Sequence, residues 1–201
     1  MRTSILIFIL TIINFYGFSQ ETPIIESNLG DTTSYEDVTI PLIGGCSLGC
    51  ALGWKMTASS NLESQGVSTY GIENIEDGDQ KTAWIEGVNG YGIGEKINIT
   101  FISPDSLDIL FYEIGLNNGY CKSKDIWKAN SRVKKARLLK NGEEKLILNF
   151  KDTMFSQIFR WDTNYITVTN KDIVTIEILE VYKGDKYEDT AISDLYLMGA
   201  H

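Results

Sequence analysis

Short strand-forming segments, separated by turn residues, run through the second half of this 201-residue sequence and limit the folds open to it. Residues 96–102 alternate polar and apolar side chains, and Asn141-Gly142 is a dipeptide typical of tight β-hairpin turns. The strand-forming segments are residues 96–102, 109–116, 132–140, 145–150, 165–169, 172–182 and 191–199. Their spacing of about 8–15 residues, with turns between them, predicts an all-β sandwich.

Helix-forming patterns are weak by comparison. Residues 124–130 are expected to make one helical turn within a long loop, and Ser106-Leu107 is a second candidate for a short turn. No internal repeat or low-complexity segment divides the chain. We therefore expect one compact domain over residues 46–201.

The N-terminus has the pattern of a secretory signal peptide over residues 1–19. Arg2 supplies a positive charge, residues 4–18 form an apolar run, and Gly17 and Ser19 place small side chains before a cleavage site. The alternative, an uncleaved membrane anchor, needs about 20 apolar residues, which this run does not reach. No later stretch is apolar enough to span a membrane, so the sequence predicts a secreted or periplasmic protein.

Residues 20–45 are expected to form an acidic lead-in that wraps around the domain or stays loose. Five acidic residues and no basic residue occur between residues 20 and 54. Signal-peptide cleavage removes Arg2 and no acid, so the formal charge changes from −9 to −10. An acidic protein of this kind is a poor general binder of nucleic acid or of anionic membranes.

The three cysteines are Cys46, Cys50 and Cys121. Export permits a disulfide, and the closeness of Cys46 and Cys50 in the sequence favours that pair. A bridge from Cys121 to either of them remains an alternative. No nearby histidine or second cysteine pair completes a zinc site.

The only histidine is His201, the last residue. Its position excludes Ser-His-Asp and Cys-His catalysis at an internal site, and no nucleophile-elbow or phosphate-binding glycine motif is present. A hydrolase that uses a carboxylate pair remains open, because acidic residues are abundant. Abundant acids more often form a solvated surface, so the prediction is a protein that is not an enzyme.

The segment Asp77-Gly78-Asp79, followed by Thr82, concentrates oxygen atoms in a short acidic turn. Calcium favours such carboxylate, carbonyl and hydroxyl oxygens, although the spacing is not that of an EF-hand. The alternative is an ordinary turn closed by aspartate hydrogen bonds.

Four ordered segments resemble a known family: residues 58–101, 117–138, 150–161 and 189–197. Together they resemble discoidin-like (coagulation factor five/eight type C) domains. More narrowly, they are similar to the translocation and glycan-binding domain of secreted bacterial NAD glycohydrolases. The resemblance covers residues 52–198.

This resemblance implies a jelly-roll, galactose-binding-like sandwich with ligand sites in the loops at one end, and a binding role toward carbohydrate. It also implies a structural calcium ion held by Asp77, Asp79 and Thr82, with Asp194 as a further acidic ligand. Trp84, directly after the turn, is expected to pack in the core.

Sugar recognition needs an apolar ring face with polar groups beside it, and two loops offer both. The first loop, residues 85–95, contributes Glu86, Asn89 and Tyr91. The second loop, residues 116–132, contributes Asn117, Asn118, Tyr120, Lys122, Trp127, Asn130 and Arg132. The alternative for Tyr120 and Trp127 is that they are buried packing residues.

Residues 122–140 carry eight basic residues and one acid, Asp125. Such a strip would favour acidic glycans, or it is the solvated face of an edge strand. Taken together, the sequence predicts a secreted, non-catalytic module that binds a glycan or another cell-surface component. A protein-binding adhesion module on the same scaffold is the main alternative, followed by the carboxylate hydrolase.

Overall fold

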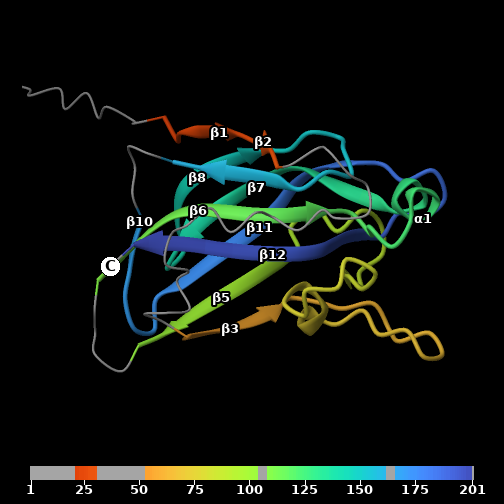
Figure 1. Ribbon diagram of the computed structural model, residues 1–201, viewed down its shortest axis with the longest axis horizontal. Helices are drawn as coiled ribbons and strands as arrows, with labels where there is room; N and C mark the ends of the chain where they lie inside the picture. Colours follow the sequence, from red (N-terminus) through yellow and green to blue (C-terminus); the bar gives the residue numbers. More distant parts are fainter. Residues whose placement is uncertain (1–20, 31–52, 104–107, 162–165, 201) are drawn as a thin grey trace, which may run out of the picture.

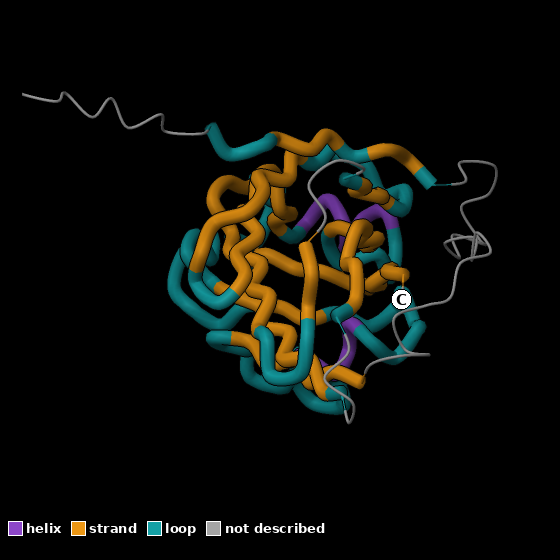
Figure 2. Tube along the Cα trace, turned by 90° about the vertical axis from the view of Figure 1, so that its left-hand side faces the viewer, coloured by secondary structure: helices purple, strands orange, loops and turns teal. Residues whose placement is uncertain are grey.

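The computed structural model describes residues 21–30, 53–103, 108–161 and 166–200. Within these ranges the chain forms a two-layer β-sandwich whose twelve strands are linked into one continuous sheet (Figure 1). Seen along the long axis of the molecule, the strands surround a common interior (Figure 2). The predicted all-β sandwich is confirmed.

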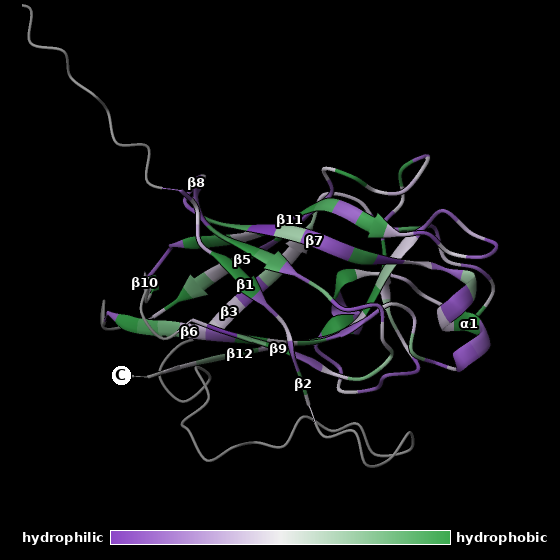
Figure 3. Cartoon of the chain, turned by 90° about the horizontal axis from the view of Figure 1, so that it is seen from above, coloured by the Kyte–Doolittle hydropathy of each residue, from purple (hydrophilic) through white to green (hydrophobic). Residues whose placement is uncertain are grey.

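The two layers are separate in the view from above (Figure 3). One layer contains β2 (Asn28–Leu29), β9 (Gln157–Arg160), β6 (Ile109–Asn118) and β12 (Thr190–Ala200), with β10 (Ile166–Val168) paired to β6 and β4 (Trp84–Ile85) paired to β12. The other contains β1 (Ile24–Glu26), β8 (Glu143–Asn149), β7 (Ser131–Lys140), β11 (Ile173–Tyr182), β5 (Lys96–Ile102) and β3 (Gly53–Ala58). The layers join where Thr190 pairs in parallel with Ser131.

Local sequence explains the strands that were predicted. In β5, Ile97, Ile99 and Phe101 are buried while the side chains between them are not, as alternation requires. The antiparallel strands β7 and β8 are joined by Asn141 and Gly142, whose φ angles are 51° and 84°. Positive φ at both positions is the geometry that Asn-Gly hairpin turns require, so the predicted hairpin is confirmed.

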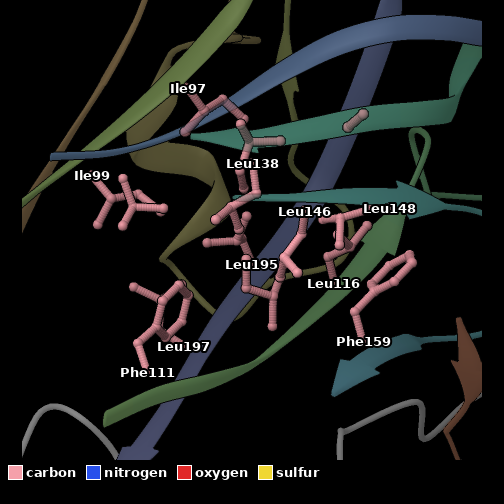
Figure 4. Close-up of a cluster of buried hydrophobic side chains, with 14 of the residues drawn as sticks. Ile97, Ile99, Phe111, Leu116, Leu138, Leu146, Leu148, Phe159, Leu195 and Leu197 are labelled. Carbon is pink, nitrogen blue, oxygen red and sulfur yellow. The ribbon is translucent and has the colours of Figure 1, made fainter. Parts of the chain in front are cut away.

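Aromatic side chains fill the space between the layers. The rings of Phe111 and Trp161 meet nearly at right angles with centroids 5.0 Å apart, and the Trp161 indole N–H donates to the Phe111 carbonyl at 2.9 Å. Figure 4 shows Phe111 and Phe159 among aliphatic side chains from both layers. Trp84 is fully buried, which confirms its predicted place in the core.

Several elements were not evident in the sequence. The predicted helical turn is confirmed as α1 (Lys124–Ala129), but β3, β4, β9 and the 3-10 helix η2 (Ile72–Ile75) were not predicted. In the described part of the lead-in, β1 pairs in parallel with β8 and β2 pairs with β9, so residues 24–29 extend both layers. The interpretation of β7 as an edge strand is wrong, because it lies between β8 and β11.

Some predictions lie outside the described residues: the signal peptide, Cys46, Cys50 and Ser106-Leu107. Cys121 is described; it is buried as a free thiol, and burial raises its pKa to about 12. Among the described residues, no helix is both long enough and apolar enough to cross a membrane.

Candidate ligand-binding site

A pocket of about 240 Å³ is lined in part by α1. Helix α1 lies at the end of the sandwich opposite the C-terminus (Figure 1). Four segments that are distant in the sequence meet there: the loop before η2, strand β4, the β6–α1 region and the segment before β12. The lining residues are Leu62, Gln65, Tyr70, Ile85, Tyr120, Ile126, Ala129, Asn130, Tyr187 and Asp189. The pocket therefore combines three tyrosines with amide and carboxylate groups.

Two of the tyrosines form adjoining walls of the pocket. The rings of Tyr70 and Tyr120 meet edge to face, with centroids 6.4 Å apart and an interplanar angle of 85°. Ile85 in β4 is hydrogen-bonded to two other lining residues. Its N–H donates to the Tyr70 carbonyl at 3.2 Å, and its carbonyl accepts from the Leu62 N–H at 2.8 Å. The backbone of the core thus positions the aromatic walls.

The polar lining includes groups that the protein itself leaves available. The Asn130 side-chain amide donates to the Ile126 carbonyl at 2.9 Å, and its oxygen accepts no hydrogen bond from the described residues. The Asp189 backbone carbonyl accepts from Ser131 at 2.9 Å, but within the described ranges its carboxylate has no hydrogen bond or ion pair. Both oxygen groups remain able to contact a ligand.

Most of the ligand residues predicted in the second loop are instead held by contacts inside the protein. The Asn118 side-chain amide makes two hydrogen bonds with the backbone of Val133. It donates to the Val133 carbonyl at 2.7 Å and accepts from the Val133 N–H at 3.0 Å. The Trp127 indole N–H donates to the Asn118 carbonyl at 2.8 Å, and the Trp127 side chain is buried. Of the residues predicted there, Tyr120 and Asn130 line the pocket, and Lys122 is exposed.

Arg132 ties this loop to the sandwich. Its guanidinium makes two contacts with Asp152, at 2.9 and 3.2 Å, and donates to the carbonyls of Trp127 at 3.3 Å and Asn130 at 2.8 Å. It also lies 4.3 Å from the centroid of the Trp127 ring. Arg132 therefore supports the wall that carries Asn130 and does not itself line the pocket.

The residues predicted in the first loop lie outside the pocket lining. Glu86 is fully buried, where it accepts hydrogen bonds from the backbone N–H groups of Val88 at 2.8 Å and Thr190 at 3.2 Å, and burial raises its pKa. The Tyr91 ring is covered by the Lys183 ammonium, 4.6 Å from its centroid. Asn89 is exposed on the same loop.

The acidic turn is closed by its own hydrogen bonds. One Asp77 oxygen accepts from the Asp79 N–H at 2.8 Å, and the other accepts from the Thr82 hydroxyl at 2.7 Å. Ser193, next to Asp194, donates to the Gln80 carbonyl at 3.2 Å and so holds the turn against β12. The aspartate-closed turn described by the alternative interpretation is present.

Asp194 lies beneath this turn and is 1% exposed. Burial raises its pKa to about 6, and the charges of Asp77 and Asp79 add to this effect. The amide nitrogen of Asn117 donates to Asp194 at 3.1 Å, while the buried Asn117 amide oxygen has no partner among the described residues. The repulsion among these acids and the unpartnered Asn117 oxygen are two features that a bound hard cation would relieve.

A metal at this position would not rest on carboxylates alone. In the part of the chain that the structure describes, no three His, Cys, Asp or Glu side chains lie close enough to form a metal site. A bound calcium would therefore need backbone carbonyls, the Thr82 hydroxyl or the Asn117 amide oxygen as additional ligands. Its contribution would be structural, since it would neutralise the repulsion between the turn and Asp194.

The basic strip of residues 122–140 is largely neutralised in the fold. Five of its eight basic side chains form ion pairs with acids on neighbouring segments: Arg132 with Asp152, Lys134 and Lys135 with Glu180, Arg137 with Glu144 and Glu177, and Lys140 with Asp172. The two lysines lower the pKa of Glu180 to about 2. This pairing removes most of the free positive charge that would attract an acidic glycan.

Sequence reasoning missed eight of the ten lining residues, among them the four with aromatic or polar side chains: Gln65, Tyr70, Tyr187 and Asp189. Each lies in a segment with no local feature beyond ordinary turn composition. Gln65, Tyr70 and Asp189 fall within the segments that carry the family resemblance, which was the available signal, whereas Tyr187 lies outside them. Only the packing of four distant segments brings these side chains together.

Comparisons with known proteins find one family model and several solved structures that are similar to the chain. A model of the NAD glycohydrolase translocation F5/8 type C domain matches residues 49–198. The C-terminal domain of a chitobiase from Bacteroides fragilis is similar, with 18% identity, a TM-score of 0.49, and coverage of 73% of this chain and 93% of that chain. A β-galactosidase of Streptococcus pneumoniae shares 8% identity, with a TM-score of 0.44 and coverage of 72% and 90%.

No curated protein sequence matches the chain closely enough to count as a relative. The family match, in contrast, extends from the residues before β3 almost to the end of β12. It includes the acidic turn and all the residues that line the pocket. The chain therefore belongs to the family of NAD glycohydrolase translocation F5/8 type C domains.

Proposed function

We propose that the protein is a secreted, non-catalytic carbohydrate-binding module whose ligand enters the pocket beside α1. One observation carries the proposal: three tyrosines line the pocket together with Gln65, Asn130 and Asp189. Aromatic faces pack against the C–H groups of a sugar ring, and amide and carboxylate oxygens accept its hydroxyl hydrogens. Membership of a family that often serves as carbohydrate-binding or translocation modules agrees with this chemistry.

The size of the pocket limits the ligand. Its volume of about 240 Å³ lies below the range of about 300–1,000 Å³ that is usual for drug-sized ligands. One sugar ring is therefore the unit that enters, and the rest of a glycan would extend over the outer loops. A terminal residue of a glycan chain suits such a pocket better than an internal one.

The proposed site predicts a difference between two tyrosines. Tyr70→Ala should weaken glycan binding at least about tenfold, because it removes one aromatic wall. Tyr91→Ala is the matched control: Tyr91 lies in the other predicted loop and does not line the pocket, so binding should persist. A glycan array followed by calorimetric titration of the strongest hit measures both. Equal losses in the two variants would contradict the proposed position of the site.

We also propose that calcium binds between the acidic turn and Asp194 as a structural ion. Thermal unfolding of the protein should show a higher melting temperature with calcium than with excess chelator. A ligand that binds only the native state, at a hundredfold excess over its dissociation constant, adds about 2.7 kcal/mol to the free energy of unfolding. The calcium response should disappear in Asp77→Ala and persist in Asp185→Ala, which alters an exposed acid outside the turn. Identical melting curves with calcium and with chelator would remove calcium from the proposal.

A protein-binding module is the second candidate, favoured by exposed apolar side chains on the loops. Val67, Val88 and Ile93 are all exposed, and the Val67 side chain is fully so. Capture of a single cell-surface protein that is lost in Val67→Ser, with no signal on glycan arrays, would favour this candidate. Turnover of a glycan that stops on replacing a carboxylate would instead indicate the hydrolase.

A further inference from the structure

We infer that the sugar ring bound in the pocket carries a free, protonated amine, so that the preferred ligand is an amino sugar and not a neutral, acetylated or acidic one. The inference rests on the proposed carbohydrate function and specifies the ligand of that same pocket.

The lining of the pocket contains a negative charge and no positive one. Asp189 is the only acidic side chain among the ten lining residues, none of which is lysine or arginine. Within the described ranges, the Asp189 carboxylate has no ion pair or hydrogen bond that would neutralise it. The charge of Asp189 also reaches the buried interior, where burial chiefly, and Asp189 in addition, raise the pKa of Glu86. A cation in the pocket would meet an attractive field.

The basic side chains of the segments around the pocket are not among its lining residues. Arg132 is paired with Asp152 and donates to two backbone carbonyls, so its charge is held behind the pocket wall. The Lys186 ammonium lies 4.8 Å from the centroid of the Tyr187 ring. The Tyr187 ring therefore already attracts a cation, and no described basic side chain enters the pocket to balance Asp189.

Aromatic rings and an amide oxygen in the pocket also favour a protonated amine. The faces of tyrosine rings attract cations, and Tyr70 and Tyr120 present rings at nearly right angles to each other. The Asn130 amide oxygen, which accepts no hydrogen bond from the described residues, can accept one from a ligand but cannot donate one. A protonated amine carries a positive charge and several hydrogen-bond donors. These match the Asp189 carboxylate, the tyrosine ring faces and the Asn130 amide oxygen. An N-acetyl group lacks the charge, and a uronic acid would meet repulsion from Asp189.

Four monosaccharides distinguish these cases: glucosamine, N-acetylglucosamine, glucose and glucuronic acid. Nuclear magnetic resonance titration of the purified protein at neutral pH should show glucosamine binding about tenfold more tightly than glucose or N-acetylglucosamine. Asp189→Asn should abolish this advantage, so that glucosamine and glucose bind with similar affinity to the variant. Asp185→Asn, a change to an exposed acid in the same segment, should retain the advantage.

The remaining outcomes separate this inference from the proposed function. Equal binding of glucosamine, N-acetylglucosamine and glucose, or tighter binding of glucuronic acid, overturns the amine preference and leaves a carbohydrate site. Binding of choline without binding of any sugar overturns both proposals and leaves a cation pocket. Failure of every probe in protein that folds normally overturns the carbohydrate function and the inference with it.

Discussion

Replacing Arg132 by alanine should lower the free energy of unfolding by about 3 kcal/mol. The guanidinium supplies hydrogen bonds to the carbonyls of Trp127 and Asn130, and a buried carbonyl left without its donor costs about 1–3 kcal/mol. Loss of the contact with the Trp127 ring adds about 0.5–1 kcal/mol. Asp152 would remain hydrated, because its side chain is 42% exposed, so no buried charge is left unpaired.

The matched control is Lys134→Ala in the same strand. Lys134 pairs with Glu180 at 2.8 Å, but both side chains are more than 40% exposed, so solvent screens this pair and its loss should cost much less stability than the loss of Arg132. Urea unfolding of the two variants, followed by tryptophan fluorescence, measures the difference. If both variants unfold at the same urea concentration, Arg132 does not hold the α1 loop in place.

Replacing Gly119 by alanine should lower the free energy of unfolding by about 3–4 kcal/mol and disturb the pocket as well. Gly119 has a φ of +96°, which costs a residue with a β-carbon about 1–2 kcal/mol. The added β-carbon would lie 2.6 Å from Cδ1 of Trp127 and 2.7 Å from Cγ of Arg132. Relief of this overlap requires movement in a packed region, at about 1–3 kcal/mol. Because Tyr120 is the next residue, sugar binding should weaken in the same variant.

Gly142→Ala separates the two causes. Gly142 also has a positive φ, +84°, but a β-carbon there meets no atom within 4 Å. This variant should lose only the backbone contribution, about 1–2 kcal/mol, and retain sugar binding. Chemical denaturation and the glycan titration, run on both variants, provide the comparison. Equal losses of stability would show that the overlap with Trp127 and Arg132 is relieved at no cost.

Residues with a periodic pattern were predictable because their structure depends on neighbours in the sequence. The alternation in β5 and the Asn141-Gly142 turn each specify backbone geometry locally, and the structure has both. The short strand β4 contains only Trp84 and Ile85, too few residues to show alternation. Its pairing with β12 depends on a strand more than a hundred residues away.

Polar loop residues were the least predictable part of the site. Asn118 and Arg132 have the chemistry of sugar ligands, yet in the structure they satisfy backbone groups of Val133, Trp127 and Asn130. An amide or guanidinium has the same donors in either role. Which role it takes depends on whether a distant segment covers it.

The sequence by itself determined the all-β class, the strands with alternating patterns, the hairpin at Asn141-Gly142 and the family, because these depend on local periodicity and ordered motifs. The tertiary structure alone decided which aromatic and polar side chains form the pocket. Tyr70, Tyr120 and Asp189 come from segments that meet only through the long-range pairing of β4, β6 and β12. The position of a loop in space depends on the whole core beneath it, and no local stretch of sequence contains that information.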